Sequence, residues 1–464
     1  MKKIIQYFLF FSLLITPLAV VVSLVVFCIS YDEVFSVYEI PWVILAFLIQ
    51  LYILKNIHLN YFSENKILMM SFLLLNVFLI FSLITFDTHP VSDYAMIWYY
   101  ANQMANEQFS IDIYKSNEYI YIYNWQLGIT AFESLIIRVF GSNFIVLKIL
   151  NVLLINITIW LTYKLSKKKF GQQVSFYTLC LYISYYPIII TCGQFSNQHI
   201  AVIFILIILN LFEKNTPKTI VLSGIFTALL NVIRPMGIIL IMTFIVWIVY
   251  VICKYSEWRK VLLYVCFYFV SLFSVQMAID QMFMRVGYAD SPISCSKVPY
   301  FKFDKGLTGY NNPDLSPFNG DVESYNQWQK KKLIGLIKNN PEEIVMFVAN
   351  KMTRYLGLFD YKFEHTYNHD ENIWQKYPIK FFYSFGWGQY IFLIIFAIVG
   401  YYKIIKDQDI DVYQIYYLGI TAVYIFIEAF TSYRYESYPI LILFASYGCY
   451  ICFNKTSIFK FSHN

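Results

Sequence analysis

Long runs without a charged side chain constrain this chain more than any other feature. Residues 4–31 and 170–212 contain no Asp, Glu, Lys or Arg, and a helix of about 20 apolar residues is enough to cross a bilayer. The chain is 59% hydrophobic and 14% charged, with a mean hydropathy of +0.55, whereas soluble domains are about 45–50% apolar and about 25% charged. These values predict an integral membrane protein and exclude a soluble enzyme, a disordered chain and a nucleic-acid binder.

Twelve segments are long and apolar enough to be candidate spans. They are residues 4–29, 40–56, 66–86, 143–163, 173–192, 196–213, 218–234, 236–254, 260–281, 380–402, 412–430 and 436–454. The string CGQFSNQH at 192–199 and the proline Pro235 separate neighbouring spans. We therefore expect an all-α membrane protein with about twelve transmembrane helices and an uncleaved N-terminal anchor. With only 17 glycines, close packing of helices through small residues is not expected.

Basic residues give the orientation. Lys and Arg accumulate in the short loops on one side of these spans, and such loops face the cytoplasm. They include Lys2, Lys3, Lys55, Lys66, Lys164, Lys167, Lys168, Lys169, Lys214, Lys218, Lys254, Arg259, Lys260, Lys403, Lys406, Lys455 and Lys460. Both termini are then cytoplasmic, and two long segments, 87–142 and 283–379, face outward.

Four parts follow from this topology. They are an N-terminal transmembrane hairpin (1–60), a membrane core with the outer loop 87–142 (61–282), an extracytoplasmic domain (283–379) and C-terminal transmembrane helices (380–464). The outer loop is expected to hold helices at 92–106 and 122–140, and the outer domain an amphipathic helix from Pro341 to about Gly357.

Five ionisable residues lie at the outer ends of predicted spans: Lys148, Arg234, Asp280, Glu428 and Arg434. Charges at membrane depth are costly and usually line a site. A charged group at the end of a span can also reach the aqueous interface without having a function. This alternative reading suits Lys148 and also Asp280. Arg234 and Arg434 stand in tight turns between helices, so they predict a shared site in the outer leaflet.

The string DTHPVSD at 87–93 begins the first outer loop. A carboxylate just outside a span can act as a general base. Asp93 could equally do no more than cap the helix that follows. The residues alone leave both readings open.

The string SDYAMIWYYANQMANEQF, followed by YIYNWQLGITAFESLIIRVFG, resembles the first outer loop of GT-C-fold glycosyltransferases. These include the family 39 protein O-mannosyltransferases, the lipid A aminoarabinose transferases and their Gram-positive relatives. The resemblance covers most of residues 66–454. Further matching strings are KKKFG (167–171), NVIRPMG (231–237), KGLTGYNNPDL (305–315) and the E-x5-RY-x3-P pattern of Glu428, Arg434, Tyr435 and Pro439.

The resemblance implies a GT-C-like fold and a role for individual residues. Asp93 falls on the family's catalytic aspartate, whereas Tyr94 replaces the second acid that many members have there. Another frequent acid position reads Asn197, Gln198, His199. Whether His199, Asp280 or Glu428 fills that second acidic role stays open.

The implied reaction moves a sugar from a polyprenyl-phosphate donor to an acceptor hydroxyl, with inversion. Asp93 would take the hydroxyl proton, and an arginine would hold the departing phosphate, with Arg434 the first choice and Arg234 the second. We expect substrate contacts from these arginines together with Tyr435, Glu428 and His199. No metal site and no cofactor are expected, although a divalent metal is left open.

The expected partners are the lipid-linked donor, a glycan, teichoic acid or protein acceptor, and membrane lipid, in a bacterial cell membrane. The main alternative is an envelope polysaccharide polymerase or O-antigen-ligase-like enzyme. A transporter or lipid flippase is a third class, but such proteins tend to show repeats and polar residues at the membrane midplane. The sugar, the acceptor and the oligomeric state do not follow from the sequence.

Overall fold

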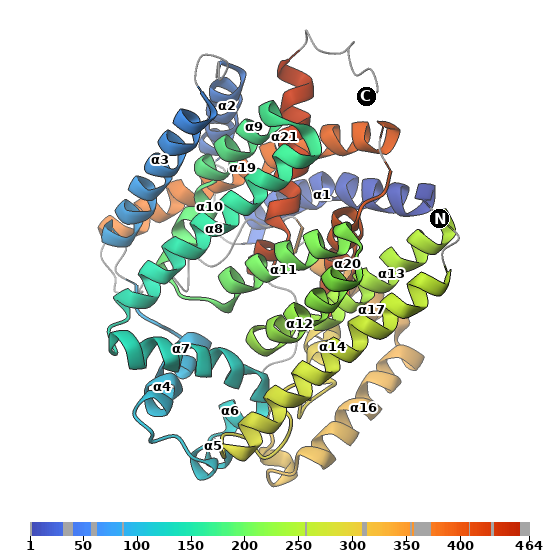
Figure 1. The fold of residues 1–464 in the computed structure, drawn as a ribbon. Coiled ribbons are helices and arrows are strands. Elements are labelled where there is room, and N and C mark those ends of the chain that lie inside the picture. Colours follow the sequence, from blue (N-terminus) through green and yellow to red (C-terminus); the bar gives the residue numbers. More distant parts are fainter. Residues whose placement is uncertain are drawn as a thin grey trace.

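The computed structural model describes residues 2–30, 40–56, 63–85, 88–255, 258–308, 313–352, 355–356, 373–407, 409–427 and 431–454. The long helices are α1 (Lys2–Ser30), α2 (Ile40–Asn56), α3 (Glu64–Thr85), α8 (Ile145–Phe170), α9 (Gln172–Ser184), α11 (Asn197–Lys214), α12 (Pro217–Ile233), α13 (Gly237–Tyr255), α14 (Trp258–Arg285), α19 (Ile373–Asp407), α20 (Val412–Phe426) and α21 (Tyr438–Phe453). Within the described ranges no residue forms a strand, so the predicted all-α membrane fold is confirmed (Figure 1).

Each predicted span except 173–192 coincides with one helix, but the helices differ in length. In the described part, six are long and apolar enough to cross a membrane: α3, α8, α11, α13, α14 and most of α19. A seventh candidate is α9 followed by α10 (Tyr186–Ile190) and η4 (Thr191–Gly193), bent by 58° at the break. The remaining apolar helices are shorter: Gln6–Val22, Ile40–Asn56, Pro217–Ile233, Val412–Phe426 and Tyr438–Phe453. The chain is a multi-pass membrane protein, and the count of twelve spans stays a prediction.

Ion pairs gather at one end of the bundle, which we call the basic end. The pairs are Lys167–Glu64 at 2.6 Å, Lys168–Glu213 at 2.7 Å, Lys169–Asp411 at 2.7 Å and Lys254–Asp409 at 2.6 Å. They join the start of α3 and α20 to the end of α8, α11 and α13. The predicted topology requires these five helix ends to lie on one side, and the contacts agree with it.

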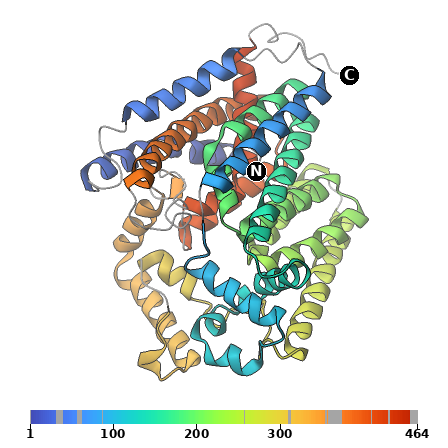
Figure 2. The same ribbon diagram turned by 90° about the vertical axis from the view of Figure 1, so that its left-hand side faces the viewer.

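The opposite end, which we call the capped end, is covered by the two long segments (Figures 1 and 2). The first forms α4 (Asp93–Ala105), α5 (Ile111–Ser116), α6 (Glu118–Ile122), η3 (Asn124–Gln126) and α7 (Leu127–Phe140). The second forms α15 (Phe301–Thr308), η5 (Ser316–Phe318), α16 (Val322–Asn339) and α17 (Pro341–Met352).

The helices expected in these segments are present with shifted bounds. The helix expected at 92–106 is α4, and the one expected at 122–140 begins only at Leu127, because α6 and η3 occupy residues 118–126. The amphipathic helix begins at Pro341 as expected, and its predicted end near Gly357 lies outside the described residues. The helix α19 begins at Ile373, before the predicted span at 380–402.

Close packing through small residues does occur, contrary to the expectation from glycine content. A Cβ on Gly448 of α21 would lie 1.9 Å from the Phe396 carbonyl oxygen of α19, and one on Gly400 would lie 2.1 Å from the Phe444 carbonyl oxygen. Each glycine therefore lets the other helix's backbone approach. A low glycine count says nothing about where the few glycines stand.

Candidate functional site at the capped end

The site is organised by η7, a 3-10 helix at Thr431–Glu436 that precedes α21. A 3-10 helix has three residues per turn, so side chains three apart point the same way and neighbours diverge by about 120°. Tyr433 and Glu436 accordingly both approach Arg234. Arg434 and Tyr435 point in two other directions, the first toward Tyr390 and the second toward His199.

Arg234 is the centre of a buried polar cluster. It precedes Pro235, and a residue before proline favours extended backbone; its φ of −152° and ψ of 124° end α12 at that point. The Arg234 Nε atom lies 2.7 Å from the Glu436 Oε1 atom, and Nη1 donates to Asn197 Oδ1 at 3.0 Å. The Glu436 side chain is fully buried and that of Arg234 is 13% exposed, so this ion pair is shielded from bulk water.

His199 forms the second part of the cluster and is almost completely buried. Its Nε2 atom lies 3.2 Å from the Thr191 carbonyl oxygen, and its Nδ1 atom lies 2.7 Å from the Tyr435 hydroxyl. A carbonyl can only accept, so Nε2 carries the hydrogen. In the neutral imidazole, Nδ1 then accepts the Tyr435 proton. These bonds tie η7 to the helix break at residues 191–198.

Arg434 is also buried, but its contacts lie on the other side of η7. Its guanidinium stacks over the Tyr390 ring at 4.3 Å, and Nη1 donates to the Leu356 carbonyl oxygen at 3.3 Å. The Tyr390 hydroxyl donates to the same carbonyl at 2.7 Å. This geometry anchors η7 to α19.

Asp93 begins α4, and the backbone just before it is strained. Ser92 has φ 54° and ψ −132° and its side chain makes no capping hydrogen bond; such conformations cost about 1–3 kcal/mol and gather at functional sites. Burial raises the pKa of Tyr119, and the Asp93 carboxylate beside it raises that pKa further. Asp93 therefore faces a neutral phenol on α6.

The start of α4 lies beside the Arg234 cluster. Tyr94 is within electrostatic range of the Arg234 guanidinium. Ile97, one turn after Asp93, packs in one hydrophobic cluster with Ile233 and Ile200. Ile233 directly precedes Arg234, and Ile200 directly follows His199. The structure thus brings the Asp93 segment, Arg234, Tyr435 and His199 into one region.

The other predicted site residues stand apart. Glu428 lies outside the described residues. Asp280 is buried and accepts hydrogen bonds from the Ser294 backbone at 3.1 Å and the Ser294 hydroxyl at 2.6 Å, so it anchors the start of the second long segment. Lys148 is buried in α8, with its Nζ atom 5.6 Å from the Phe144 ring centroid.

Sequence reasoning missed Glu436 and the role of Asn197. Glu436 directly follows the Arg434–Tyr435 pair, and a carboxylate in an otherwise apolar run could have been noticed there. The sequence analysis named Asn197 only because the resembled family often has an acidic residue at that position. Its amide instead accepts a hydrogen bond from Arg234.

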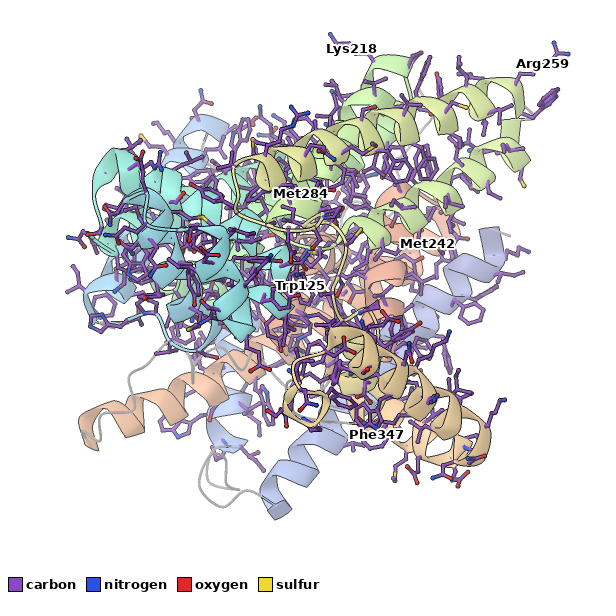
Figure 3. All side chains as sticks on the ribbon, turned by 90° about the horizontal axis from the view of Figure 1, so that it is seen from below. Trp125, Lys218, Met242, Arg259, Met284 and Phe347 are labelled. Atoms are coloured by element: carbon purple, nitrogen blue, oxygen red, sulfur yellow. The ribbon has the colours of Figure 1, made fainter. Side chains whose placement is uncertain are left out.

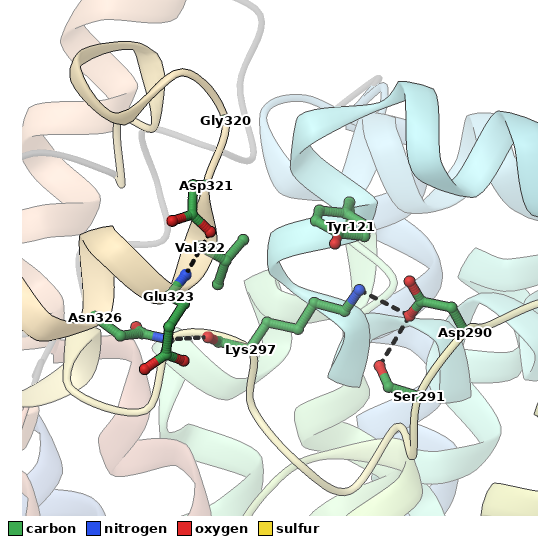
Figure 4. Close-up of a pocket in the computed structure, with 9 residues that line it drawn as sticks. All are labelled: Tyr121, Asp290, Ser291, Lys297, Gly320, Asp321, Val322, Glu323 and Asn326. Carbon is green, nitrogen blue, oxygen red and sulfur yellow. Dashed lines mark hydrogen bonds and ion pairs between the residues drawn. The ribbon is translucent and has the colours of Figure 1, made fainter.

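A separate cleft of about 490 Å³ lies between the two long segments (Figure 4). Its polar groups bind each other: Lys297 pairs with Asp290 at 2.8 Å and lies over the Tyr121 ring at 3.3 Å, while Asn326 donates to the Lys297 carbonyl at 2.8 Å. Of these contacts, only the one between Lys297 and Tyr121 joins the two segments, and the other two lie within the second segment. Among the described residues, no group of three or more His, Cys, Asp or Glu side chains could hold a metal ion.

Comparisons with known proteins give little further. No family model and no curated protein matches this chain. A crystal structure of ArnT from Cupriavidus metallidurans bound to undecaprenyl phosphate aligns with 81% of this chain and 77% of its own, at 9% identity and a TM-score of 0.35. A likeness at that score lends no weight to a function.

Proposed function

We propose that this chain is a membrane glycosyltransferase that moves a sugar from a polyprenyl-phosphate donor to a hydroxyl of a cell-envelope acceptor. The acceptor oxygen attacks the anomeric carbon, and the bond from that carbon to the phosphate oxygen breaks. The proton passes to the Asp93 carboxylate, and the electron pair leaves with the polyprenyl phosphate. A single displacement of this kind inverts the anomeric centre.

The observation that supports this proposal best is the position of the Asp93 segment beside a buried arginine. Ile97, one turn after Asp93, packs in one hydrophobic cluster with Ile233, which directly precedes Arg234. The segments of the candidate base and of a candidate phosphate ligand are therefore neighbours. A fixed guanidinium can stabilise charge that develops on a departing phosphate. The resemblance implies the same arrangement, a carboxylate base and a phosphate-binding arginine in one site.

Arg234 is a better phosphate ligand than Arg434, which reverses the order expected from the sequence. Arg434 stacks on Tyr390 and donates to a backbone carbonyl inside the bundle. Arg234 keeps 13% of its side chain exposed and lies near Tyr94. Glu436, whose carboxylate holds Arg234 Nε, is the positioning residue for it.

His199 and Tyr435 support the same site. Their 2.7 Å hydrogen bond fixes η7 against the helix break, and we place them as substrate-side residues of the cluster. Neither side chain carries a carboxylate, and the carboxylate of Asp280 is bonded to Ser294. Glu428 is therefore the residue that we assign to the second acidic role of the resembled family. Glu436 does not fill this role, because its carboxylate is committed to Arg234.

The direct test is to compare cell-envelope glycans of a strain lacking this protein with the same strain complemented by the wild-type chain. We expect one glycosyl modification to disappear in the deletion and to return on complementation, while its polyprenyl-phosphate sugar accumulates. Unchanged glycans with no accumulated donor would contradict the proposal.

A further inference from the structure

The helical hairpin formed by α16 and α17 exposes apolar side chains around its turn. The last two turns of α16 expose 42% of Ile334 and 55% of Ile337, and the first two turns of α17 expose 69% of Val345 and 56% of Met346. The Asn340–Pro341 turn joins these two helix ends. Four large apolar residues thus share one end of the hairpin, which we call the hairpin tip.

Lysines accompany this apolar surface. Lys330, Lys331 and Lys338 are exposed on α16 and form no ion pair with a described residue. The nearby exposed acid is Glu342 of α17. An apolar surface flanked by unpaired lysines is typical of helices that lie in the interface of an anionic membrane.

The hairpin is attached where the membrane surface must lie. Lys351 near the end of α17 donates to the Ile427 carbonyl at the capped end of α20. Beside it, Phe426 is 54% exposed on the apolar helix α20, so the lipid-facing surface of the bundle continues toward α17. Seen from below, the helix that carries Phe347 lies at the margin of the molecule (Figure 3).

We propose that the hairpin tip inserts into the membrane leaflet at the capped end, with Ile334, Ile337, Val345 and Met346 at the acyl boundary. Lys330, Lys331 and Lys338 then bind anionic phospholipid headgroups. The hairpin would hold the second long segment at a fixed height above the bilayer. This inference is independent of the proposed reaction.

The test is lipid quenching of a fluorescent label. A polarity-sensitive fluorophore is attached to Ile337→Cys, and in a second protein to Gln327→Cys, an exposed position about three turns earlier on α16. In both, the exposed Cys253, Cys266 and Cys295 are replaced by serine. The full chains are placed in nanodiscs of phosphatidylcholine with 0, about 25 or about 50% phosphatidylglycerol, with or without spin-labelled acyl chains.

We expect the label at 337 to shift to shorter wavelength and to be quenched at least twofold more strongly than the label at 327. Equal quenching at both positions would overturn the proposal. A shifted but unquenched label at 337 would also overturn it, because the tip would then be covered by protein, such as a second copy of the chain.

The lysines are tested in the same nanodiscs. Quenching at 337 should increase with phosphatidylglycerol content, and the triple change Lys330→Gln, Lys331→Gln and Lys338→Gln should abolish that increase. The Lys115→Gln variant is the control, since Lys115 is an exposed lysine on α5, in the first long segment and away from the tip. An unchanged dependence on phosphatidylglycerol in the triple variant would contradict headgroup binding.

Discussion

At the residue scale, the Arg234–Glu436 pair couples stability to the proposed chemistry. Removing one partner of a buried ion pair leaves an uncompensated charge and typically costs about 3–5 kcal/mol. We therefore expect Arg234→Gln and Glu436→Gln each to lower the thermal midpoint strongly in lipid or detergent. The double variant, which leaves no buried charge, should recover most of that loss.

Sugar transfer should respond differently from stability. If Arg234 holds the donor phosphate, the double variant stays inactive although it is folded, as measured by release of polyprenyl phosphate. A double variant that regains both stability and transfer would show that the pair is only structural. Arg434→Ala serves as comparison, because its contacts with Tyr390 and Leu356 predict lost stability before lost donor binding.

Glu133 on α7 predicts a pH dependence of stability. It is buried, and burial raises its pKa well above the ordinary value of 4.5. The folded state thus keeps a proton that the unfolded state releases, so the folded state loses stability as pH rises above 4.5. We expect Glu133→Gln to raise the thermal midpoint more at pH 8 than at pH 5.

The measurement is the midpoint difference between Glu133→Gln and wild type across pH 4.5–8. A difference that stays constant over this range would mean that Glu133 does not hold a proton in the folded protein. The matched control is Glu118→Gln, which makes the same exchange at an exposed position of α6 in the same outer loop.

Part of the site could be predicted from the sequence because charged residues are rare in apolar runs. Arg234 and Arg434 were found this way, whereas Asp93, Tyr435 and His199 were assigned through the resemblance. The structure places the segments of Asp93, Arg234, Tyr435 and His199 together. The direction of Arg434 could not be predicted. That direction depends on η7 being a 3-10 helix, in which successive side chains are about 120° apart around the axis, compared with about 100° in an α-helix.

At the element scale, the crossing of α19 and α21 depends on glycine. A Cβ on Gly448 would lie 1.9 Å from the Phe396 carbonyl oxygen, and backbone atoms cannot move aside cheaply. We expect Gly448→Ala to separate the helices and lower the thermal midpoint by several degrees. Gly335→Ala on α16 has nothing within 4 Å and should be neutral or stabilising by up to about 1 kcal/mol.

A Gly448→Ala variant as stable as Gly335→Ala would contradict this crossing. The existence and order of the membrane helices followed from apolar runs and their breaks, whereas this contact did not. Hydropathy reports how many residues are apolar, and close approach depends on which single residue lacks a side chain.

At the scale of the whole molecule, the orientation in the membrane can be tested by labelling. The ion pairs of the basic end and the two long segments lie at opposite ends of the bundle. In chains whose exposed Cys253, Cys266 and Cys295 are replaced by serine, we expect an impermeant thiol reagent to label Asn319→Cys in intact cells. The reagent should label Lys168→Cys only after permeabilisation. The reverse pattern would invert the orientation and place the candidate site in the cytoplasm.

Replacement of Asp93 by asparagine tests the central claim most directly. Asparagine keeps the shape of the side chain. Because Ser92 and not Asp93 is the N-cap residue of α4, the exchange removes only the favourable interaction of the charge with the helix dipole, about 0.3–1 kcal/mol. Asparagine cannot accept the acceptor's proton. We expect Asp93→Asn to insert and fold normally and to lose about 10²–10⁴-fold in sugar transfer from the polyprenyl-phosphate sugar. Asp87 is the other acid of the DTHPVSD string and the rival base, and Asp87→Asn should have a milder effect. Full transfer activity in Asp93→Asn would contradict Asp93 as the base, and full activity in both variants would contradict the proposed mechanism.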